Sequence, residues 1–247
     1  MMAVALTAGL VGGFVRGYSG FGFALAAVPI LTVAFPPVAA VPAVLPLELL
    51  LAVTTIPSQR VHVQWTTVRW LALGALIGTP VGVAVLTFMP ADLMRLIIGL
   101  FVFLAVVLLW HVPALPGMLR PLPLWGAGFA SGLFGGGTAM SGPPVILALL
   151  GSGQQVVVAR ANLMVFIAIS AAWAMAVAAA SRLYRADTLA TVLILVPAVL
   201  AGGWAGLTIF ERTSKLHYRG VSFVILIGVT IVAVSTAAWN LLAKAFS

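Results

Sequence analysis

The chain has 247 residues, of which 63% are hydrophobic and 6% are charged, and its formal net charge is +8. A soluble domain carries about 25% charged residues, so most of this chain is expected to lie in lipid. The basic residues stand singly at the ends of apolar segments, which is typical of the inner face of a membrane and excludes a nucleic-acid-binding patch. The lack of cysteine excludes disulfides and thiolate chemistry, and three histidines far apart in the sequence predict no metal site.

Eight apolar segments follow one another along the chain, and a membrane-spanning helix needs about 20 such residues. They occupy residues 3–35, 38–57, 68–88, 93–111, 122–151, 156–180, 188–210 and 218–243. The segments are continuous apolar runs without inside-outside alternation, which favours helices over membrane-spanning strands. We therefore predict an all-α, multi-pass protein of the bacterial inner membrane, with residues 1–247 forming one membrane domain.

The first and fifth segments are too long for one straight span, and each is interrupted by glycines. The first interruption reads Arg16-Gly17-Tyr18-Ser19-Gly20-Phe21-Gly22. The second reads Gly135-Gly136-Gly137-Thr138-Ala139-Met140-Ser141-Gly142-Pro143-Pro144. We predict that both segments are broken into half-helices, because the other segments have no such interruption.

The two interruptions occupy matching places in an internal repeat. Aligning Gly13 with Gly132 brings the interruptions together, and Gly78 then matches Gly202 after a small drift in offset. This predicts two halves, 1–112 and 120–247, each with one broken segment and three ordinary spans. If each broken segment returns to the side on which it entered, the halves are inverted, and the distribution of basic residues favours this arrangement. Paired interruptions in two halves point to the binding site of a secondary transporter.

Arg16 and Glu48 are the two charged residues that lie away from segment ends. A charge at the centre of a bilayer costs at least about 2.5–3.5 kcal/mol, so it tends to face a cavity and to have a function. Arg16 fits an anion site, although pairing with Glu48 to hold two helices together would also explain it. Glu48 fits equally a proton-coupling carboxylate or a structural partner of Arg16.

An unwound stretch survives in a membrane only where it lines a cavity or is packed in protein. A half-helix that restarts after the interruption, near Gly20 or near Ser141, presents unpaired amides and the positive end of its dipole. We predict that two such ends face each other at mid-membrane and bind an anion together with Arg16. Asn162 could donate to a bound oxyanion or make a bond between helices. The spaced pairs Gly9/Gly13, Gly78/Gly82, Gly128/Gly132 and Gly202/Gly206 predict close helix packing. The expected substrate-binding residues are Arg16, Gly17, Tyr18, Ser19, Gly20, Phe21, Gly22, Gly136, Gly137, Thr138, Ser141, Gly142 and Asn162, with Glu48 as the coupling candidate.

The stretches from Gly12 to Phe23 and from Gly128 to Gly137 resemble the paired signatures of the TauE/SafE sulfite-exporter family, also called the toluene-sulfonate uptake permeases. The resemblance covers essentially the whole chain and implies transport of sulfite or a small organosulfur anion such as a sulfonate or sulfoacetate. The first interruption departs from the glycine-rich pattern, since Arg16 and Tyr18 stand opposite Gly135 and Gly137.

We therefore expect a secondary transporter that moves a small sulfur-containing anion by alternating access, with a proton or sodium as the possible coupling ion. No cofactor, resident metal or covalent chemistry is expected, because no acid, base and nucleophile set lies at membrane depth. The alternatives are an anion channel with the same site and, less favoured by two matched interruptions, a subunit of a membrane complex.

Overall fold

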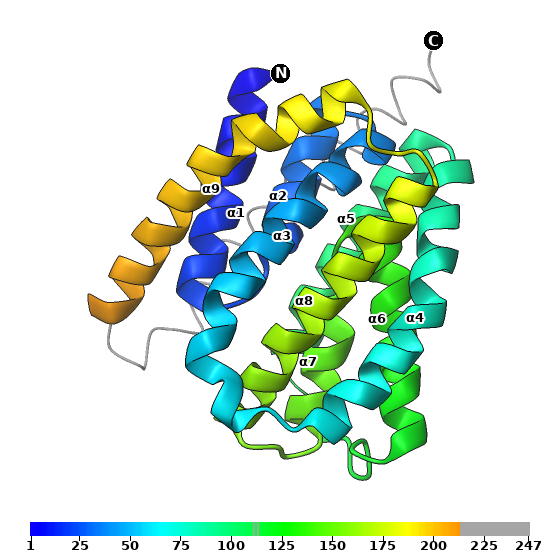
Figure 1. The fold of residues 1–247 in the computed structure, drawn as a ribbon, viewed down its shortest axis with the longest axis vertical. Helices are drawn as coiled ribbons and strands as arrows, with labels where there is room; N and C mark the ends of the chain where they lie inside the picture. Colours follow the sequence, from blue (N-terminus) through cyan, green and yellow to red (C-terminus); the bar gives the residue numbers. More distant parts are fainter. Residues whose placement is uncertain (111, 113, 213–247) are drawn as a thin grey trace. The chain divides into compact units, whose positions relative to one another are not determined.

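The computed structural model describes residues 1–110, 112 and 114–212 of the chain. All regular structure in these residues is helical, which confirms the all-α prediction for this part (Figure 1). The predicted segment at 218–243 lies outside the described residues. The helices are α1 (Met2–Ser19), α2 (Phe23–Ala34), α3 (Pro37–Gln59), η1 (Arg60–His62), α4 (Trp65–Phe88), α5 (Ala91–Trp110), α6 (Pro121–Thr138), α7 (Gly142–Gly151), α8 (Val156–Ala180) and α9 (Ala186–Arg212).

Five of these helices are long and apolar enough to cross a membrane, namely α3, α4, α5, α8 and α9. Helices α2 and α7 are also apolar but have only 12 and 10 residues. Length and composition together support a multi-pass membrane protein.

The helix boundaries follow local chemistry. Pro37 and Pro121 are the first residues of α3 and α6, where the missing N–H of proline costs nothing. Asp92 lies in the first turn of α5, where the helix dipole favours a negative charge. Pro80 and Pro197 lie inside α4 and α9, as membrane helices tolerate.

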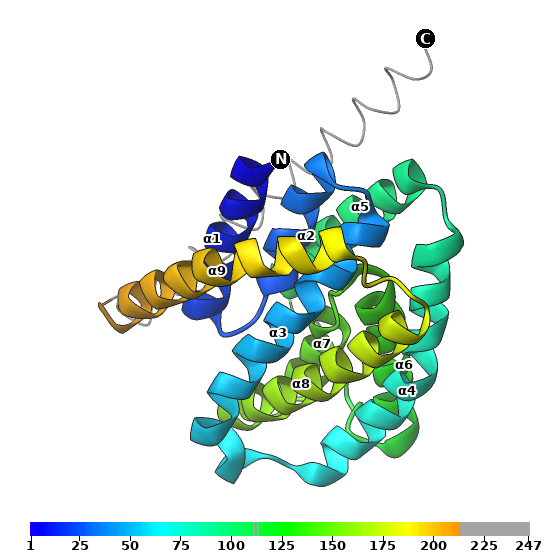
Figure 2. The same cartoon turned by 45° about the horizontal axis from the view of Figure 1, so that its top comes forward.

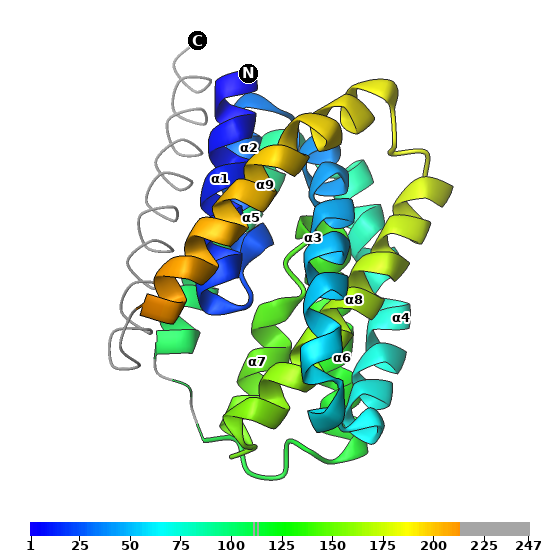
Figure 3. The ribbon, with the colours of Figure 1, turned by 60° about the vertical axis from the view of Figure 1, so that its left-hand side comes forward.

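The helices are grouped in two compact units that do not coincide with the two halves of the sequence. Among the described residues, one unit consists of 1–44, 88–107 and 185–212, and in it α1 packs against α2 and α9 (Figure 3). The other consists of residues 45–87 and 108–184 and holds α4, α6, α7 and α8 (Figure 2). Each unit therefore contains helices from both halves.

Close packing at the spaced glycines is confirmed in both units. In the first unit, a side chain at Gly13 of α1 would collide with the carbonyl of Val199 and would lie 3.0 Å from the amide nitrogen of Gly203. In the second unit, a side chain at Gly132 of α6 would lie 2.7 Å from the carbonyl of Ala75 and 2.9 Å from the amide nitrogen of Thr79. Backbone therefore lies against backbone in both helix pairs.

These two sets of contacts have the same register. A side chain at Gly17 would collide with the carbonyl of Gly203 and would lie against the amide of Leu207. A side chain at Gly136 would likewise collide with the carbonyl of Thr79 and would lie against the amide of Val83. The positions in α1 and α6 are related by the offset of 119 that aligns Gly13 with Gly132, and those in α9 and α4 by the offset of 124 that aligns Gly78 with Gly202.

Candidate functional site

The first break is a short turn between α1 and α2. Helix α1 ends at Ser19 and α2 begins at Phe23, so only residues 20–22 lie between them. Gly20 has φ 78° and Gly22 has φ 89°, which is the left-handed region that glycine adopts without strain. The amide of Gly20 donates to the carbonyl of Arg16 at 2.8 Å and closes the last turn of α1. One helix thus ends and the next begins within three residues.

The second break has the same backbone construction in the other unit. Helix α6 ends at Thr138 and α7 begins at Gly142, so residues 139–141 form the turn. The amide of Ala139 donates to the carbonyl of Gly135 at 2.9 Å, as Gly20 donates to Arg16. Ala139 has φ 60°, so an alanine here occupies the left-handed region where the first break has a glycine.

A hydroxyl group closes each break in the same way. The hydroxyl of Ser19 donates to the carbonyl of Val15 at 2.6 Å and accepts from the amide of Phe21 at 3.3 Å. The hydroxyl of Thr138 donates to the carbonyl of Phe134 at 2.7 Å and accepts from the amide of Met140 at 3.3 Å. Ser19 and Thr138, two of the expected substrate-binding residues, therefore lie at the breaks, and in this structure their hydroxyl hydrogens are directed to the backbone.

The helices that restart after the breaks differ in the donors they offer. No side chain caps the N-terminus of α2 or of α7. The first turn of α2 consists of Phe23, Ala24 and Leu25, each of which has an amide hydrogen that the helix itself leaves unbonded. The first turn of α7 is Gly142 followed by two prolines, which have no amide hydrogen.

The side chains around the breaks also differ. Arg16 lies in the last turn of α1 and is 3% exposed. Tyr18 is buried and stacks on Phe14 with a distance of 6.2 Å between ring centroids, whereas Phe21 in the turn is half-buried. Gly135, opposite Arg16 in the repeat alignment, faces Ser141 and the hydroxyl of Ser170, which would lie 3.0 and 3.3 Å from a side chain at that position.

In the second break a further serine ties the turn to its helix. The hydroxyl of Ser131 in α6 donates to the carbonyl of Ser141, the residue that precedes α7. Gly12 stands at the corresponding place in α1, where a side chain would lie 2.9 Å from the Cβ of Ala27 in α2. The second break is thus held by a hydrogen bond, and the first by apolar contact between α1 and α2.

Asn162 lies in α8, is fully buried and takes part in a polar network of the second unit. Its carbonyl oxygen accepts from the amide of Gln64 at 2.7 Å, and its amide group donates to Gln154 at 3.3 Å. Gln154 in turn donates to Gln64 at 2.8 Å. The network connects α8 with the segments that precede α4 and α8. Asn162 therefore makes hydrogen bonds between segments, which was the alternative to a contact with a bound oxyanion.

Glu48 lies in α3 and is 5% exposed. It belongs to the unit that also contains Gly136, Gly137, Thr138, Ser141, Gly142 and Asn162. Arg16 and the residues to Gly22 belong to the other unit. Within each unit, the structure brings the predicted residues of one break together. No cluster of three His, Asp or Glu side chains that could hold a metal is found in the part of the chain that is described.

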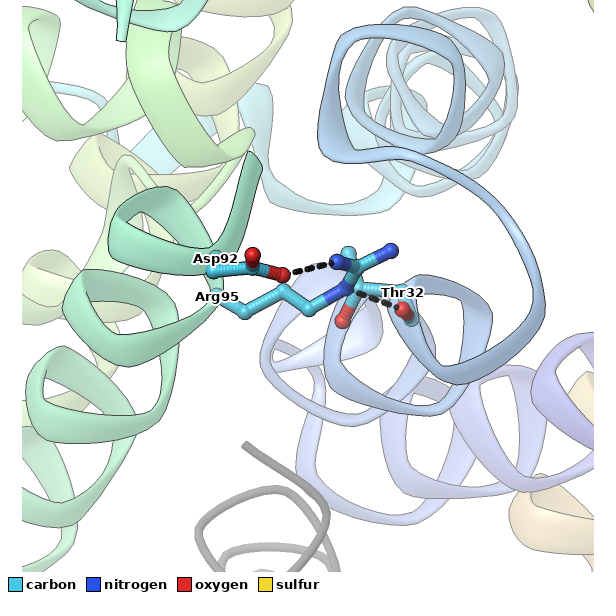
Figure 4. A network of polar contacts seen from close by, with 3 residues as sticks. All are labelled: Thr32, Asp92 and Arg95. Atoms are coloured by element: carbon cyan, nitrogen blue, oxygen red, sulfur yellow. Dashed lines mark hydrogen bonds and ion pairs between the residues drawn. The ribbon is translucent and has the colours of Figure 1, made fainter. Parts of the chain in front are cut away.

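Arg95 was missed as a candidate by sequence reasoning, although it is tied to the first break through α2. It lies in α5 and donates from Nε to the carbonyl of Thr32 at 2.9 Å, and its Nη1 lies 2.9 Å from Asp92 (Figure 4). Thr32 is in the last turn of α2, where carbonyls lack helical partners, so Arg95 caps this helix. The offset of 124 that aligns Gly78 with Gly202 also aligns Arg95 with Arg219, and this match was the signal in the sequence that could have identified Arg95.

A known protein family matches nearly the whole length of the chain. A family model described as sulfite exporter TauE/SafE matches residues 5–233. A protein of Cupriavidus necator described as a probable sulfite/organosulfonate exporter TauE is 28% identical over 246 residues, which cover 93% of each chain. No solved structure matches the chain.

Proposed function

The chain belongs to the TauE/SafE sulfite exporter family, whose members are membrane transporters and not enzymes, and from this premise we propose that it carries sulfite or a small organosulfonate across the bacterial inner membrane. In the proposed mechanism the oxyanion head group binds at the first break, between Arg16 and the N-terminus of α2. Alternating exposure of this site to the two sides moves the anion.

The observation that carries the proposal is the burial of Arg16 beside the break. Its side chain is 3% exposed and projects from the last turn of α1, four residues before Gly20. A guanidinium has five N–H donors in a rigid fork that matches an oxyanion. Across the turn, α2 begins without a side-chain cap, so its first amides and its dipole also favour negative charge.

The first break is a better anion site than the second because it keeps its donors. Three first-turn amides remain at α2, whereas Pro143 and Pro144 remove two of the three at α7. Arg16 adds a full positive charge at a position where the second break has Gly135. We therefore assign the head group to the first break, instead of sharing it between two facing helix ends.

The proposed substrate class follows from the relative and from the residues of the turn. The Cupriavidus necator protein is described as an exporter of sulfite and organosulfonates, and both carry a sulfur oxyanion. Phe21 is half-buried in the turn itself and provides an apolar wall for the organic part of a sulfonate. Tyr18 is buried against Phe14, and the proposal gives it a supporting role in placing Arg16.

The repeat of residues 1–112 and 120–247, with inverted halves, is part of the proposal. It is supported by the matching register of the α1–α9 and α6–α4 contacts and by the matching hydroxyl bonds at the two breaks. Backbone packed on backbone resists sliding, so α1 should move together with α9, and α6 together with α4. The moving bodies in this mechanism are the two compact units, each of which mixes helices from both halves.

Uptake into proteoliposomes tests the proposal. Wild-type protein should give saturable uptake of labelled sulfite or sulfonate, and Arg16→Ala should reduce it at least tenfold because a hydrogen bond to a charged group contributes about 1.5–3 kcal/mol. Arg120→Ala, at an exposed arginine that precedes α6, is the matched control and should transport normally. Full transport by folded Arg16→Ala would remove Arg16 from the site.

Uptake under imposed gradients and thermal shifts with added ligands separate the rival functions. Flux that does not saturate and does not respond to an imposed proton or sodium gradient would indicate a channel. Absence of a ligand-dependent thermal shift with sulfite, sulfonates, carboxylates and phosphate would favour a subunit of a membrane complex. Glu48→Gln should abolish the response to a proton gradient if Glu48 carries the coupling proton, and should leave it unchanged if Glu48 is structural.

A further inference from the structure

A cavity of about 300 Å³ lies between α4 and α8 in the second unit, apart from the first break. The residues that line it include Arg69, Leu73 and Leu76 of α4 and Ile169, Ser170 and Trp173 of α8. Both helices are candidate membrane spans. We call this cavity the α4–α8 groove.

The walls of the α4–α8 groove are apolar and open toward the surroundings of the helices. Leu73, Leu76 and Ile169 are 42%, 47% and 40% exposed. In a multi-pass membrane protein such side chains at mid-helix face hydrocarbon, so a lipid chain can enter the groove from the bilayer. An acyl chain would be in contact with apolar surface on both sides of the groove.

The groove has a positive charge at one end. Arg69 is exposed, lies near the start of α4, and holds the carbon of its guanidinium 5.6 Å from the centre of the Trp70 ring. Trp65, at the first position of α4, is 63% exposed. Tryptophan and arginine near a helix end are typical of the level of lipid head groups. From Arg69 to Leu76 the groove follows α4 for about 10 Å.

The inner end of the groove is held by a hydrogen bond between its two helices. The indole N–H of Trp173 donates to the carbonyl of Leu76 at 3.2 Å, which connects α8 to α4 at this level. The Ser170 hydroxyl is buried, with 1% of the residue exposed, and makes no hydrogen bond within the described residues. This hydroxyl faces α6, since it would lie 3.3 Å from a side chain at Gly135, so the proposed lipid contacts the apolar walls of the groove and not Ser170.

We propose that the α4–α8 groove binds one acyl chain of an anionic phospholipid whose head group contacts Arg69. The apolar walls select the chain, and the arginine selects the negative head group over a zwitterionic one. Basic positions between membrane helices are suited to such head groups, since a guanidinium makes two parallel hydrogen bonds to a phosphate. The site holds structural lipid and takes no part in binding the transported anion.

Quenching of Trp173 fluorescence by brominated lipids tests this proposal on the full-length protein in nanodiscs. The chain has seven tryptophans, so the Trp173 signal is the difference between wild type and Trp173→Phe. Brominated phosphatidylglycerol should quench this signal at about fivefold lower mole fraction than brominated phosphatidylcholine. Arg69→Ala should abolish the preference, and Arg120→Ala should preserve it.

A second variant keeps the test decisive if Arg69→Ala alters folding. Ala72→Phe places a ring in the groove and should remove the quenching of Trp173 by either lipid while Arg69 remains. Equal quenching by the two lipids in wild type would overturn the selection by Arg69. No quenching of Trp173 in wild type would mean that another segment of the chain or a second copy covers the groove, and would overturn the lipid assignment.

Discussion

The two breaks have similar backbone conformations but different side chains. Each closes a helix with a left-handed residue and a hydroxyl that bonds the carbonyl four residues back. The first break then presents Arg16 and a helix start with its amides intact, whereas the second presents Gly135 and a helix start with two prolines. The backbone is thus shared by both breaks, whereas the donors of the proposed anion site lie in one of them.

The difference between the two breaks separates residues that maintain the shape of a break from residues that can donate to an anion. The glycines at helix contacts and the hydroxyls of the turns maintain the shape of both breaks. The donors that can hold an anion are concentrated in the first. Changes to the shared features should therefore act equally on both breaks, and changes to the donors should act on the first alone.

The largest effect is expected at the glycines that both breaks share. Gly17→Leu and Gly136→Leu each place a side chain against backbone atoms of the neighbouring helix, so each should lower stability by about 3 kcal/mol or more. In a chain of this size that lowers Tm by roughly 6–12 °C. Gly126→Leu is the matched control, because a side chain at Gly126 meets no atom within 4 Å. A large loss at one glycine and none at the other would break the equivalence of the two helix pairs.

Arg16→Lys should have the next largest effect, and it should fall on binding alone. Lysine keeps the charge but loses the planar fork, so sulfonate affinity measured by calorimetry should fall about tenfold without a change in Tm. Arg120→Lys should leave the affinity unchanged. An unchanged affinity in Arg16→Lys would reduce the role of Arg16 to its charge.

Exchanging glycine and alanine at the two left-handed positions should give stability changes that differ by about 1 kcal/mol. Gly20→Ala introduces strain at φ 78°, which lowers Tm, whereas Ala139→Gly relieves the strain of an alanine at φ 60° and should leave Tm equal or higher. Thermal unfolding of the two variants side by side measures the difference. A lower Tm in Ala139→Gly than in Gly20→Ala would contradict it.

The smallest effect is expected at the prolines of the second break. Pro143→Ala and Pro144→Ala each restore one amide hydrogen at the start of α7, whereas the proposed site of the transported anion is at the start of α2. Sulfonate affinity should change by less than about threefold, because the restored amides make no direct contact with the anion and a neutral hydrogen bond contributes about 0.5–1.5 kcal/mol only where it is made. A tenfold change in either direction would move the anion toward the second break.

The positions of the helices could be predicted well from hydropathy. The predicted segments 156–180 and 93–111 match α8 and α5 closely, because long apolar runs between polar residues leave little choice in a bilayer. The two breaks were predicted from glycine and proline, which disturb a helix for reasons visible in the sequence alone. Both interruptions are shorter than predicted, since residues 16–19 lie inside α1 and residues 135–138 lie inside α6.

The side-chain roles were harder to predict because they depend on what packs nearby. Ser19 and Thr138 donate to carbonyls of their own helices, which sequence spacing does not distinguish from donation to a ligand. Asn162 meets Gln64, a partner 98 residues away. The capping of α2 by Arg95 likewise depends on the packing of α5 against α2. Such contacts are set by tertiary structure, which a local pattern does not contain.

Site-directed thiol protection tests most directly whether the anion occupies the first break. The chain has no cysteine, so Ala24→Cys in the first turn of α2 and Ser141→Cys before α7 each give a single thiol without background. The account predicts that saturating sulfonate slows modification of Ala24→Cys by a small thiol reagent at least fivefold and leaves Ser141→Cys unaffected. Protection of Ser141→Cys alone, or equal protection of both, would contradict it.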